Sequence, residues 1–222
     1  QIELRVLASI ANDKNMIDAF KSGTDIHTVT ASQVFGLPVD MVTPELRSRA
    51  KAVNFGIVYG IGAFSLSKDI GVTRAEADSY IKNYLATYPQ VAEYMEKTIE
   101  DAKKNGYVTT LYGRRRRLPE LSSSNGNLRA FGERAARNAP IQGTAADIIK
   151  LAMIRVFEKL KADVPTAKLI LQVHDELIVE CDEKDSEKVC RLLETEMENA
   201  ANLAVKLTAD SHSGKTWLEA KG

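Results

Sequence analysis

The sequence predicts a helix-rich α+β fold with one small antiparallel sheet late in the chain. The first reason is that most segments carry apolar residues at helical spacing behind a recognisable start, as where Thr43 and Pro44 precede Glu45. The second is that 168–173 and 177–181 are short apolar, β-branched segments separated by three polar residues, which is typical of a hairpin. No internal repeat or low-complexity segment interrupts this pattern.

Each further element is predicted from its own start and stop signals. Thr73 with Glu76 forms a capping box, Pro89 suits a first helical position, and Pro140 should break a helix because proline removes a backbone donor. Thr144 then restarts a long helix. In chain order, the expected elements are a helical pattern up to Phe20, helices over 26–36, 44–59, 74–88 and 89–105, a hairpin over 107–117, helices over 128–138, 144–160 and 186–202, and a final strand over 204–208.

Length and charge bound the class of protein. A chain of 222 residues with 44% hydrophobic residues can bury a sizeable core as one large domain or two modest ones. The net charge is zero, but 114–117 is an unbroken arginine run and 175–198 is mostly acidic. This asymmetry indicates a local anion-binding surface on a neutral molecule.

Cysteine usage and hydropathy bear on the compartment. Cys181 and Cys190 are the only cysteines and lack metal-ligand spacing, so a disulfide framework is excluded and a reduced, cytoplasmic setting is expected. No signal peptide and no apolar run long enough for a bilayer is seen, so no membrane partner is expected. Because Gln1 already lies inside an apolar periodic pattern, we expect the chain to be cut from a longer one.

One stripe of four side chains predicts a ligand. Arg47, Lys51, Phe55 and Tyr59 recur every four residues, so a helix would present two cations followed by two rings on one face. Such a face suits a ligand with an anionic end and a flat end, as a nucleoside triphosphate has. The alternative is an ordinary amphipathic helix with the rings in the core and the cations in water.

The hairpin between the two late strands predicts a metal site. Asp175 and Glu176 at its tip offer oxygen ligands for a hard cation such as Mg²⁺, and His174 adds a third polar group. Turns are also polar for reasons unrelated to metals, which is the alternative. The apolar strand residues, which should hold the tip by being buried, are Leu169, Leu171, Val173, Leu177 and Val179.

Basic and amide side chains predict contact with a phosphate backbone. The arginine run follows Tyr107 and precedes a helix on which Arg134, Asn138 and Gln142 again step by four. Amide groups at that spacing could meet base edges or sugars in a groove. A solvated charge run and a polar surface stripe are the alternatives.

Several motifs, in order along nearly the whole chain, resemble those of family A DNA polymerases, the bacterial DNA polymerase I type. The matching motifs are Arg47-x-x-x-Lys51-x-x-x-Phe55-Gly56-x-x-Tyr59-Gly60, Gln172-Val173-His174-Asp175-Glu176, Gln1-Ile2-Glu3-Leu4-Arg5, Asp25-Ile26-His27, Gly113-Arg114-Arg115-Arg116 and Arg134-x-x-x-Asn138-x-x-x-Gln142. The resemblance implies a helix-rich fingers subdomain with a partial palm. Residues 1–20 would be the palm edge, 21–125 the fingers, and 126–222 the palm with its carboxylate hairpin.

The implied reaction is template-directed DNA synthesis, in which deoxynucleoside triphosphates are added to the 3′ end of a primer–template DNA. The nucleotide-binding residues that the resemblance implies are Arg47, Lys51, Phe55, Tyr59, His27, Glu3 and Gln1. Arg47, Lys51 and His27 would hold the triphosphate, and Phe55 would pack against the incoming sugar and base.

The resemblance also implies the catalytic, selectivity and DNA-binding residues. Tyr59 would hydrogen-bond Glu3, which would block a 2′-hydroxyl. Asp175 would bind catalytic Mg²⁺ in a two-metal mechanism with Glu176 beside it, and His174 would lie near the primer end. The implied catalytic residues are Asp175, Glu176, Lys51 and His174, and the implied DNA-binding residues are Arg114, Arg115, Arg116, Arg134, Asn138 and Gln142, the last three tracking the minor groove.

One departure from the family limits the expected activity. The family's first palm motif opens with Asp-Tyr-Ser directly before the segment matched by Gln1 to Arg5, and that aspartate bridges both metals. Because this chain starts at Gln1, we expect the isolated chain to be weak or inactive without the missing N-terminal part of the polymerase. The alternatives are a non-catalytic fragment that binds nucleotide or primer–template, and a partner chain that supplies the aspartate.

Overall fold

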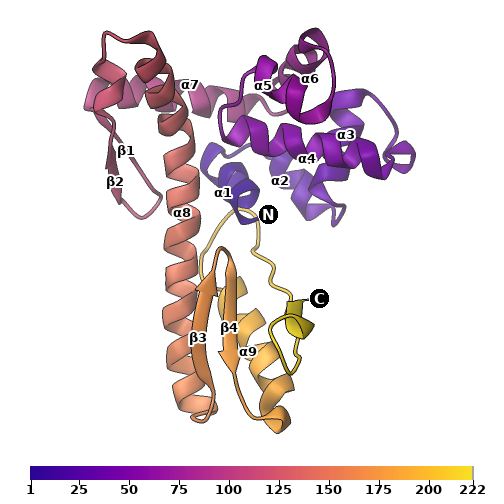
Figure 1. Ribbon diagram of the computed structural model, residues 1–222, viewed down its shortest axis with the longest axis vertical. Helices are drawn as coiled ribbons and strands as arrows, with labels where there is room; N and C mark the ends of the chain where they lie inside the picture. The colour runs from indigo at the N-terminus through magenta and orange to yellow at the C-terminus, as the bar shows by residue number, and fades with distance from the viewer. Residues whose placement is uncertain (222) are drawn as a thin grey trace. The chain divides into compact units, whose positions relative to one another are not determined.

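A computed structural model describes residues 1–221, which form two compact units (Figure 1). One unit holds Gln1 with residues 3–144, and the other holds Ile2 with residues 145–221. Each unit is described by itself below. The predicted α+β class is confirmed, because helices dominate and the sheets are two small antiparallel pairs.

The first unit is built largely from helices that start and stop where their caps predict. Thr43 accepts a hydrogen bond from the Leu46 amide at the start of α4, and Thr73 and Glu76 form the predicted capping box of α6. Gly106 takes a positive φ of 76° after α7, which a glycine tolerates. The helices are α1 (Ile2–Ala11), α2 (Lys14–Lys21), α3 (Ile26–Phe35), the 3-10 turn η1 (Val39–Met41), α4 (Pro44–Val58), α5 (Ala63–Ile70), α6 (Arg74–Thr87) and α7 (Pro89–Asn105).

The predicted basic hairpin is present and rests on its own small core. Strands β1 (Tyr107–Thr109) and β2 (Arg115–Arg117) pair antiparallel, with Val108 opposite Arg116. The short helix η2 (Pro119–Ser122) follows β2. The side chains that anchor this region form one buried apolar cluster of Ile99, Ala102, Val108, Leu118, Leu121, Ala135, Ala136 and Ala139.

The predicted break at Pro140 is wrong. Helix α8 (Gly126–Asp163) runs without interruption through Pro140. A proline inside a helix costs about 3 kcal/mol because of its missing N–H and its ring clash. Burial of Ala139 and Ile141 on either side of the proline holds the helical path. Thr144 therefore lies inside a helix and not at a start: its hydroxyl accepts a hydrogen bond from the Leu111 amide at 2.9 Å.

The second unit packs a hairpin against two helical segments. Strands β3 (Lys168–Val173) and β4 (Glu176–Glu180) pair antiparallel, with a bulge between Leu169 and Leu171, and α9 (Ser186–Glu198) follows the 3-10 turn η3 (Glu183–Asp185). Their core comprises Val156, Leu160, Val164, Ala167, Val189 and Leu192. A last 3-10 turn, η4 (Glu219–Lys221), ends the described chain.

Two predictions for this unit are wrong. Residues 204–208 form no strand, although Val205 and Leu207 are buried, because the segment pairs with no neighbouring strand. The hairpin strands are also less buried than their composition predicts. Leu169, Leu177 and Val179 pack on the core, but Leu171 keeps 44% of its surface exposed because a two-stranded sheet has one face without a covering layer. Within residues 1–221, no helix is both long and apolar enough to cross a bilayer.

The buried Thr144 hydroxyl gives a first testable prediction. Thr144→Val should lower the free energy of unfolding by about 2 kcal/mol, because the Leu111 amide would lose its acceptor at a fully buried side chain. Thr98→Val is the matched control, since its hydroxyl only donates to a carbonyl of its own helix, that of Tyr94. Urea unfolding followed by circular dichroism, with exchange of the Leu111 amide measured by NMR, tests this. Equal losses in the two variants would contradict it.

Candidate functional site

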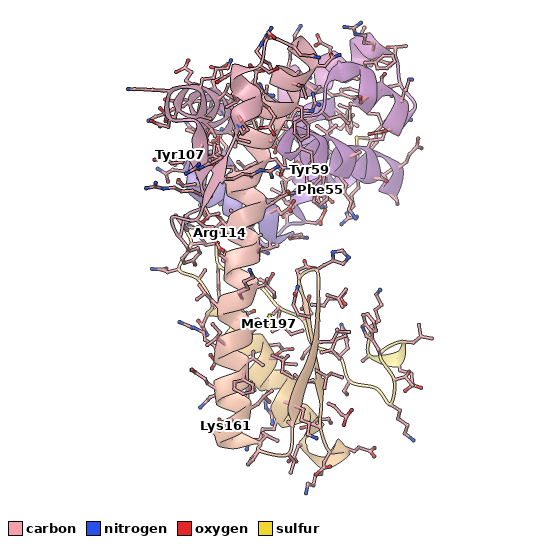
Figure 2. The ribbon with its side chains drawn as sticks, turned by 60° about the vertical axis from the view of Figure 1, so that its left-hand side comes forward. Phe55, Tyr59, Tyr107, Arg114, Lys161 and Met197 are labelled. Atoms are coloured by element: carbon pink, nitrogen blue, oxygen red, sulfur yellow. The ribbon has the colours of Figure 1, made fainter. Side chains whose placement is uncertain are left out.

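The predicted stripe on α4 is an exposed face and not a core. Lys51 is exposed, Phe55 is half-buried and Tyr59 keeps 41% of its surface exposed. The opposite side of α4 is buried through Ala50, Val53, Asn54 and Ile57. The two rings lie nearly parallel, 18° apart with centroids 6.3 Å from each other, and Figure 2 labels them side by side. The alternative that places both rings in the core is therefore wrong.

Arg47 begins this stripe but is already engaged. Asp25, the N-cap of α3, accepts hydrogen bonds from Arg47 Nε and Nη2, both at 2.9 Å, in a two-pronged ion pair. It also accepts from the amide and hydroxyl of Thr28. Burial raises the pKa of Asp25, but the bonds from Arg47 and Thr28 outweigh burial and bring the pKa down to about 2. The Asp25–Arg47 pair is thus charged at every physiological pH.

His27 lies beside the stripe as a neutral ring. Its side chain is 3% exposed, and its ring centroid is 5.9 Å from that of Phe55. Burial lowers the pKa of His27 to about 4. The positive charges of Arg47 and Lys51 lower the pKa further, and only the negative charge of Asp25 raises it. Asn54 Nδ2 lies 3.1 Å from His27 Nδ1. The first unit therefore brings His27, Phe55 and the start of the α4 stripe together from two helices.

The depressed pKa of His27 predicts a pH dependence of stability. Between pH 7 and pH 5 the unfolded state, with an ordinary pKa of 6.5, binds a proton that the folded state does not, so stability falls as pH falls. Between pH 7 and pH 5, the free energy of unfolding of the unsubstituted chain should fall by about 2 kcal/mol more than that of His27→Gln. Urea unfolding at pH 7, 6 and 5 measures the two slopes. Parallel slopes would show that His27 titrates normally.

Tyr59 joins three helices of the first unit. Its hydroxyl donates to Glu3 Oε2 of α1 at 3.2 Å and also bonds Gln142 of α8. Burial, followed by the charge and hydrogen bond of Glu3, raises the pKa of Tyr59 above its usual range. The next residue, Gly60, has a φ of 67°, and a Cβ there would lie 3.2 Å from Arg134 Cγ. A close approach of the α4 end to α8 thus requires this glycine.

The polar stripe on α8 is brought to this junction. Arg134 lies against Gly60, and Gln142 bonds Tyr59. Between them, Asn138 is half-buried, and within residues 1–221 its Oδ1 atom has no hydrogen-bond partner. An amide oxygen without a partner is a candidate acceptor for a ligand donor.

The arginine run lines a cavity with the same helix. Arg114, Arg115 and Arg116 are exposed, and Arg114 Nη2 donates to the Gly143 carbonyl at 2.9 Å. Figure 2 labels Arg114 and Tyr107 on the hairpin, where Arg115 lies 4.8 Å from the centre of the Tyr107 ring. The lining residues of this cavity of about 430 Å³ are Val108, Thr109, Thr110, Arg114, Arg115, Arg116, Ala139, Gln142 and Gly143.

The carboxylate hairpin lies in the second unit. The tip is a two-residue turn of His174 and Asp175 between the paired residues Val173 and Glu176, with His174 at a φ of 53°. His174, Asp175 and Glu176 are all exposed. Two exposed carboxylates suit Mg²⁺, which takes one or two from a protein and its other ligands from phosphates and water. No group of three potential metal-ligating side chains occurs in the part of the chain that is described.

The structure thus divides the predicted site residues between the two units. The nucleotide set from Gln1 to Tyr59 and the DNA set from Arg114 to Gln142 belong to the first unit, and the metal set belongs to the second. Sequence reasoning missed Asp25 as the partner of Arg47 and Asn54 as the partner of His27. The N-cap position of Asp25 was a signal for the first, while nothing in the spacing indicates the second.

Comparisons with known proteins agree with the resemblance of the motifs. The family model described as DNA polymerase family A matches residues 1–219. DNA polymerase I of Geobacillus stearothermophilus and that of Bacillus subtilis are each 52% identical over 221 residues, which is the whole of this chain and 25% of each relative. The chain therefore spans about a quarter of these relatives. A solved structure described as the POL domain of Pol1 from M. smegmatis, in complex with DNA primer-template and dNTP, has a TM-score of 0.95 at 42% identity, covering 100% of this chain and 39% of that one.

Proposed function

The chain belongs to DNA polymerase family A, and we propose that it forms the nucleotide-binding and part of the catalytic region of a larger DNA-directed DNA polymerase. That enzyme would transfer a nucleotide from a deoxynucleoside triphosphate to a primer 3′ end. The observation that carries the proposal is the exposed α4 face, on which Lys51 and the stacked pair Phe55 and Tyr59 lie beside the neutral His27.

The α4 face would bind the incoming nucleotide. Lys51, joined by Arg47 once it leaves Asp25, would offset the charge that develops on the departing pyrophosphate. Phe55, whose ring is only partly buried, would pack against the sugar and base, and the exposed Tyr59 would lie by the templating position. The Tyr59–Glu3 bond would occupy the space that a 2′-hydroxyl needs and so favour deoxy substrates. Gln1, exposed at the start of α1, completes the proposed nucleotide set.

The tip of the β3–β4 hairpin would hold the metal. Asp175 and Glu176 are the carboxylates that would bind Mg²⁺, with two ions expected in the complete enzyme, and His174 would lie near the primer end. When bound, the metal supplies charge stabilisation for the attacking and leaving oxygens. The tip contributes rigid placement of its carboxylates, because Leu169, Leu177 and Val179 fix both strands to the core of the second unit.

The arginine cavity and the α8 stripe would contact primer–template DNA. Arg115 and Arg116 are exposed cations suited to phosphate oxygens, and Arg114 is fixed by the Gly143 carbonyl. The Asn138 Oδ1 atom and the Gln142 amide would meet base edges or sugars in the minor groove. In subdomain terms, we propose residues 1–20 as the palm edge, 21–125 as the fingers and 126–222 as the palm.

Primer extension by a chimaera tests the proposal. Residues 1–222 would replace the matching quarter of the Geobacillus stearothermophilus relative, to which they are 52% identical. The chimaera should extend a primer with deoxynucleoside triphosphates and Mg²⁺, whereas the isolated chain should show little or no extension. Absence of extension by a folded chimaera would overturn the proposal.

Titration of the isolated chain separates the alternatives. A labelled duplex and a labelled deoxynucleoside triphosphate are titrated with the chain at two salt concentrations. Binding that weakens with salt, without extension, identifies a binding fragment, because released counterions make phosphate contacts salt-dependent. Extension by the chain mixed with a fragment carrying the remaining part of the relative would show that a second chain can complete the active site.

A further inference from the structure

A buried polar network surrounds His27 within the first unit. Asn54 and Thr30 are completely buried, and Asn54 Nδ2 lies 3.1 Å from both His27 Nδ1 and Thr30 Oγ1. Thr30 Oγ1 lies 3.5 Å from the Tyr88 hydroxyl, which in turn donates to Gln33 Oε1 at 2.8 Å. Burying an amide costs free energy unless its donors and acceptors are hydrogen-bonded. We therefore asked what this polar network between α3 and α4 does.

The direction of these hydrogen bonds follows from the donors available. The Tyr88 hydroxyl donates its proton to Gln33 Oε1, so at its contact with Thr30 the Tyr88 oxygen is an acceptor. The Thr30 oxygen accepts from Asn54 Nδ2, and its own proton has two acceptors, the Tyr88 oxygen at 3.5 Å and Asn54 Oδ1 at 3.3 Å. The second proton of that NH₂ group then points to His27 Nδ1, which must carry a lone pair. Whichever acceptor takes the Thr30 proton, the Asn54 NH₂ group remains a donor to His27 Nδ1.

This direction fixes which nitrogen of His27 carries its proton. A neutral imidazole has one N–H and one lone pair, so an accepting Nδ1 leaves the proton on Nε2. Within residues 1–221, Asn54 is the residue that hydrogen-bonds the His27 ring, and it does so through Nδ1. The Nε2–H group is therefore the one left for a ligand.

We propose that Asn54 is a positioning residue, which holds His27 in its Nε2–H form so that the ring offers a neutral donor to a phosphate oxygen of the bound triphosphate. This proposal rests on the proposed function, because it takes the triphosphate as the ligand of His27. The neutral donor differs in kind from the cations Arg47 and Lys51. It contributes direction to the binding of the phosphate chain without adding a charge that must be desolvated.

NMR of the isolated chain decides the tautomer without any nucleotide. The chain is labelled with ¹⁵N-histidine and recorded at pH 7, and the His27 signals are identified by their loss in His27→Gln. We expect a lone-pair nitrogen at Nδ1 and a protonated nitrogen at Nε2. In Asn54→Leu, which keeps the side-chain size but has no donor, the two nitrogens should change toward intermediate shifts. A proton on Nδ1 in the unsubstituted chain would overturn the proposal.

Kinetics of the chimaera test whether the Nε2–H form of His27 contributes to binding of the triphosphate. Asn54→Leu should raise KM for the deoxynucleoside triphosphate about tenfold, roughly the loss of one hydrogen bond, with a smaller change in kcat. In a His27→Gln background the same substitution should add less than twofold, because Asn54 acts through His27. Asn83→Leu, an exposed asparagine that donates to the Val34 carbonyl, is the control.

The outcomes separate this proposal from the proposed function. Equal effects of Asn54→Leu with and without His27 would assign Asn54 a purely structural role and overturn the proposal. A chimaera that does not extend a primer would remove the triphosphate as the ligand, and so overturn this proposal together with the proposed function. If Asn54→Leu fails to fold, the ¹⁵N shifts of the unsubstituted chain still decide the tautomer.

Discussion

Asp175→Asn should reduce primer extension by the chimaera at least about 10³-fold, which corresponds to about 4 kcal/mol of transition-state stabilisation. The substitution keeps the size of the side chain and removes one of only two carboxylates at the hairpin tip. A hard cation binds a neutral amide more weakly than a carboxylate, so the loss should appear in kcat. The measurement is single-turnover extension at saturating nucleotide over a range of Mg²⁺ concentrations.

The control for this experiment lies in the same unit. Asp182→Asn removes an exposed carboxylate whose neighbour is Lys184, at 3.6 Å, and should leave extension within about twofold. Because Asp175 is exposed, its substitution should leave the circular dichroism spectrum and duplex binding unchanged. If Asp175→Asn extended primers as well as the unsubstituted chimaera, the metal site would not lie at this hairpin.

Lys51→Ala should lower kcat/KM for the incoming nucleotide by about 10² to 10³-fold, the usual cost of removing one preorganised electrostatic group. Lys51 is exposed in the middle of the stripe, whereas Arg47 is held by Asp25. The loss should be larger for a triphosphate substrate than for binding of the nucleoside, because the ammonium group acts on the phosphates. Steady-state extension with varied nucleotide measures it.

Arg49→Ala is the matched control for Lys51→Ala. Arg49 lies on the same helix but pairs with Glu45 at 2.9 Å, one turn earlier, and is not part of the stripe. Its removal should change kcat/KM by less than about threefold, because an exposed ion pair of this spacing contributes little. Similar losses in both variants would mean that the helix responds to any lost cation and that the stripe has no special role.

The parts of the fold that follow from local signals were predictable. Thr43 and Pro44 at the start of α4 act within one helical turn, and so does the capping box of α6. The uninterrupted α8 was not predictable, because the packing of Ala139 and Ile141 overrides the local effect of Pro140. Burial of residues 204–208 without strand pairing likewise depends on distant neighbours that a local pattern does not contain.

The candidate site shows the same division. The stripe on α4 follows from four-residue spacing alone, and the structure agrees that it is one exposed face. The partners of that stripe come from elsewhere in the chain: Glu3 is 56 positions from Tyr59, and Asp25 is 22 positions from Arg47. Spacing carries no information about such pairs, so the hydrogen bonds that set protonation states needed the structure.

Because the Arg47 guanidinium is already paired with Asp25, an anion that reaches α4 must compete with the Asp25 carboxylate to bind it. Acid cannot open the pair near neutrality, because the pKa of Asp25 is about 2. Release of Arg47 then depends on exchange with another anion, and a polyanion presents several oxygens where a single phosphate presents few. Arg47 would therefore bind only ligands with enough negative charge to displace Asp25, and it would stay paired with Asp25 in the presence of ligands with less charge.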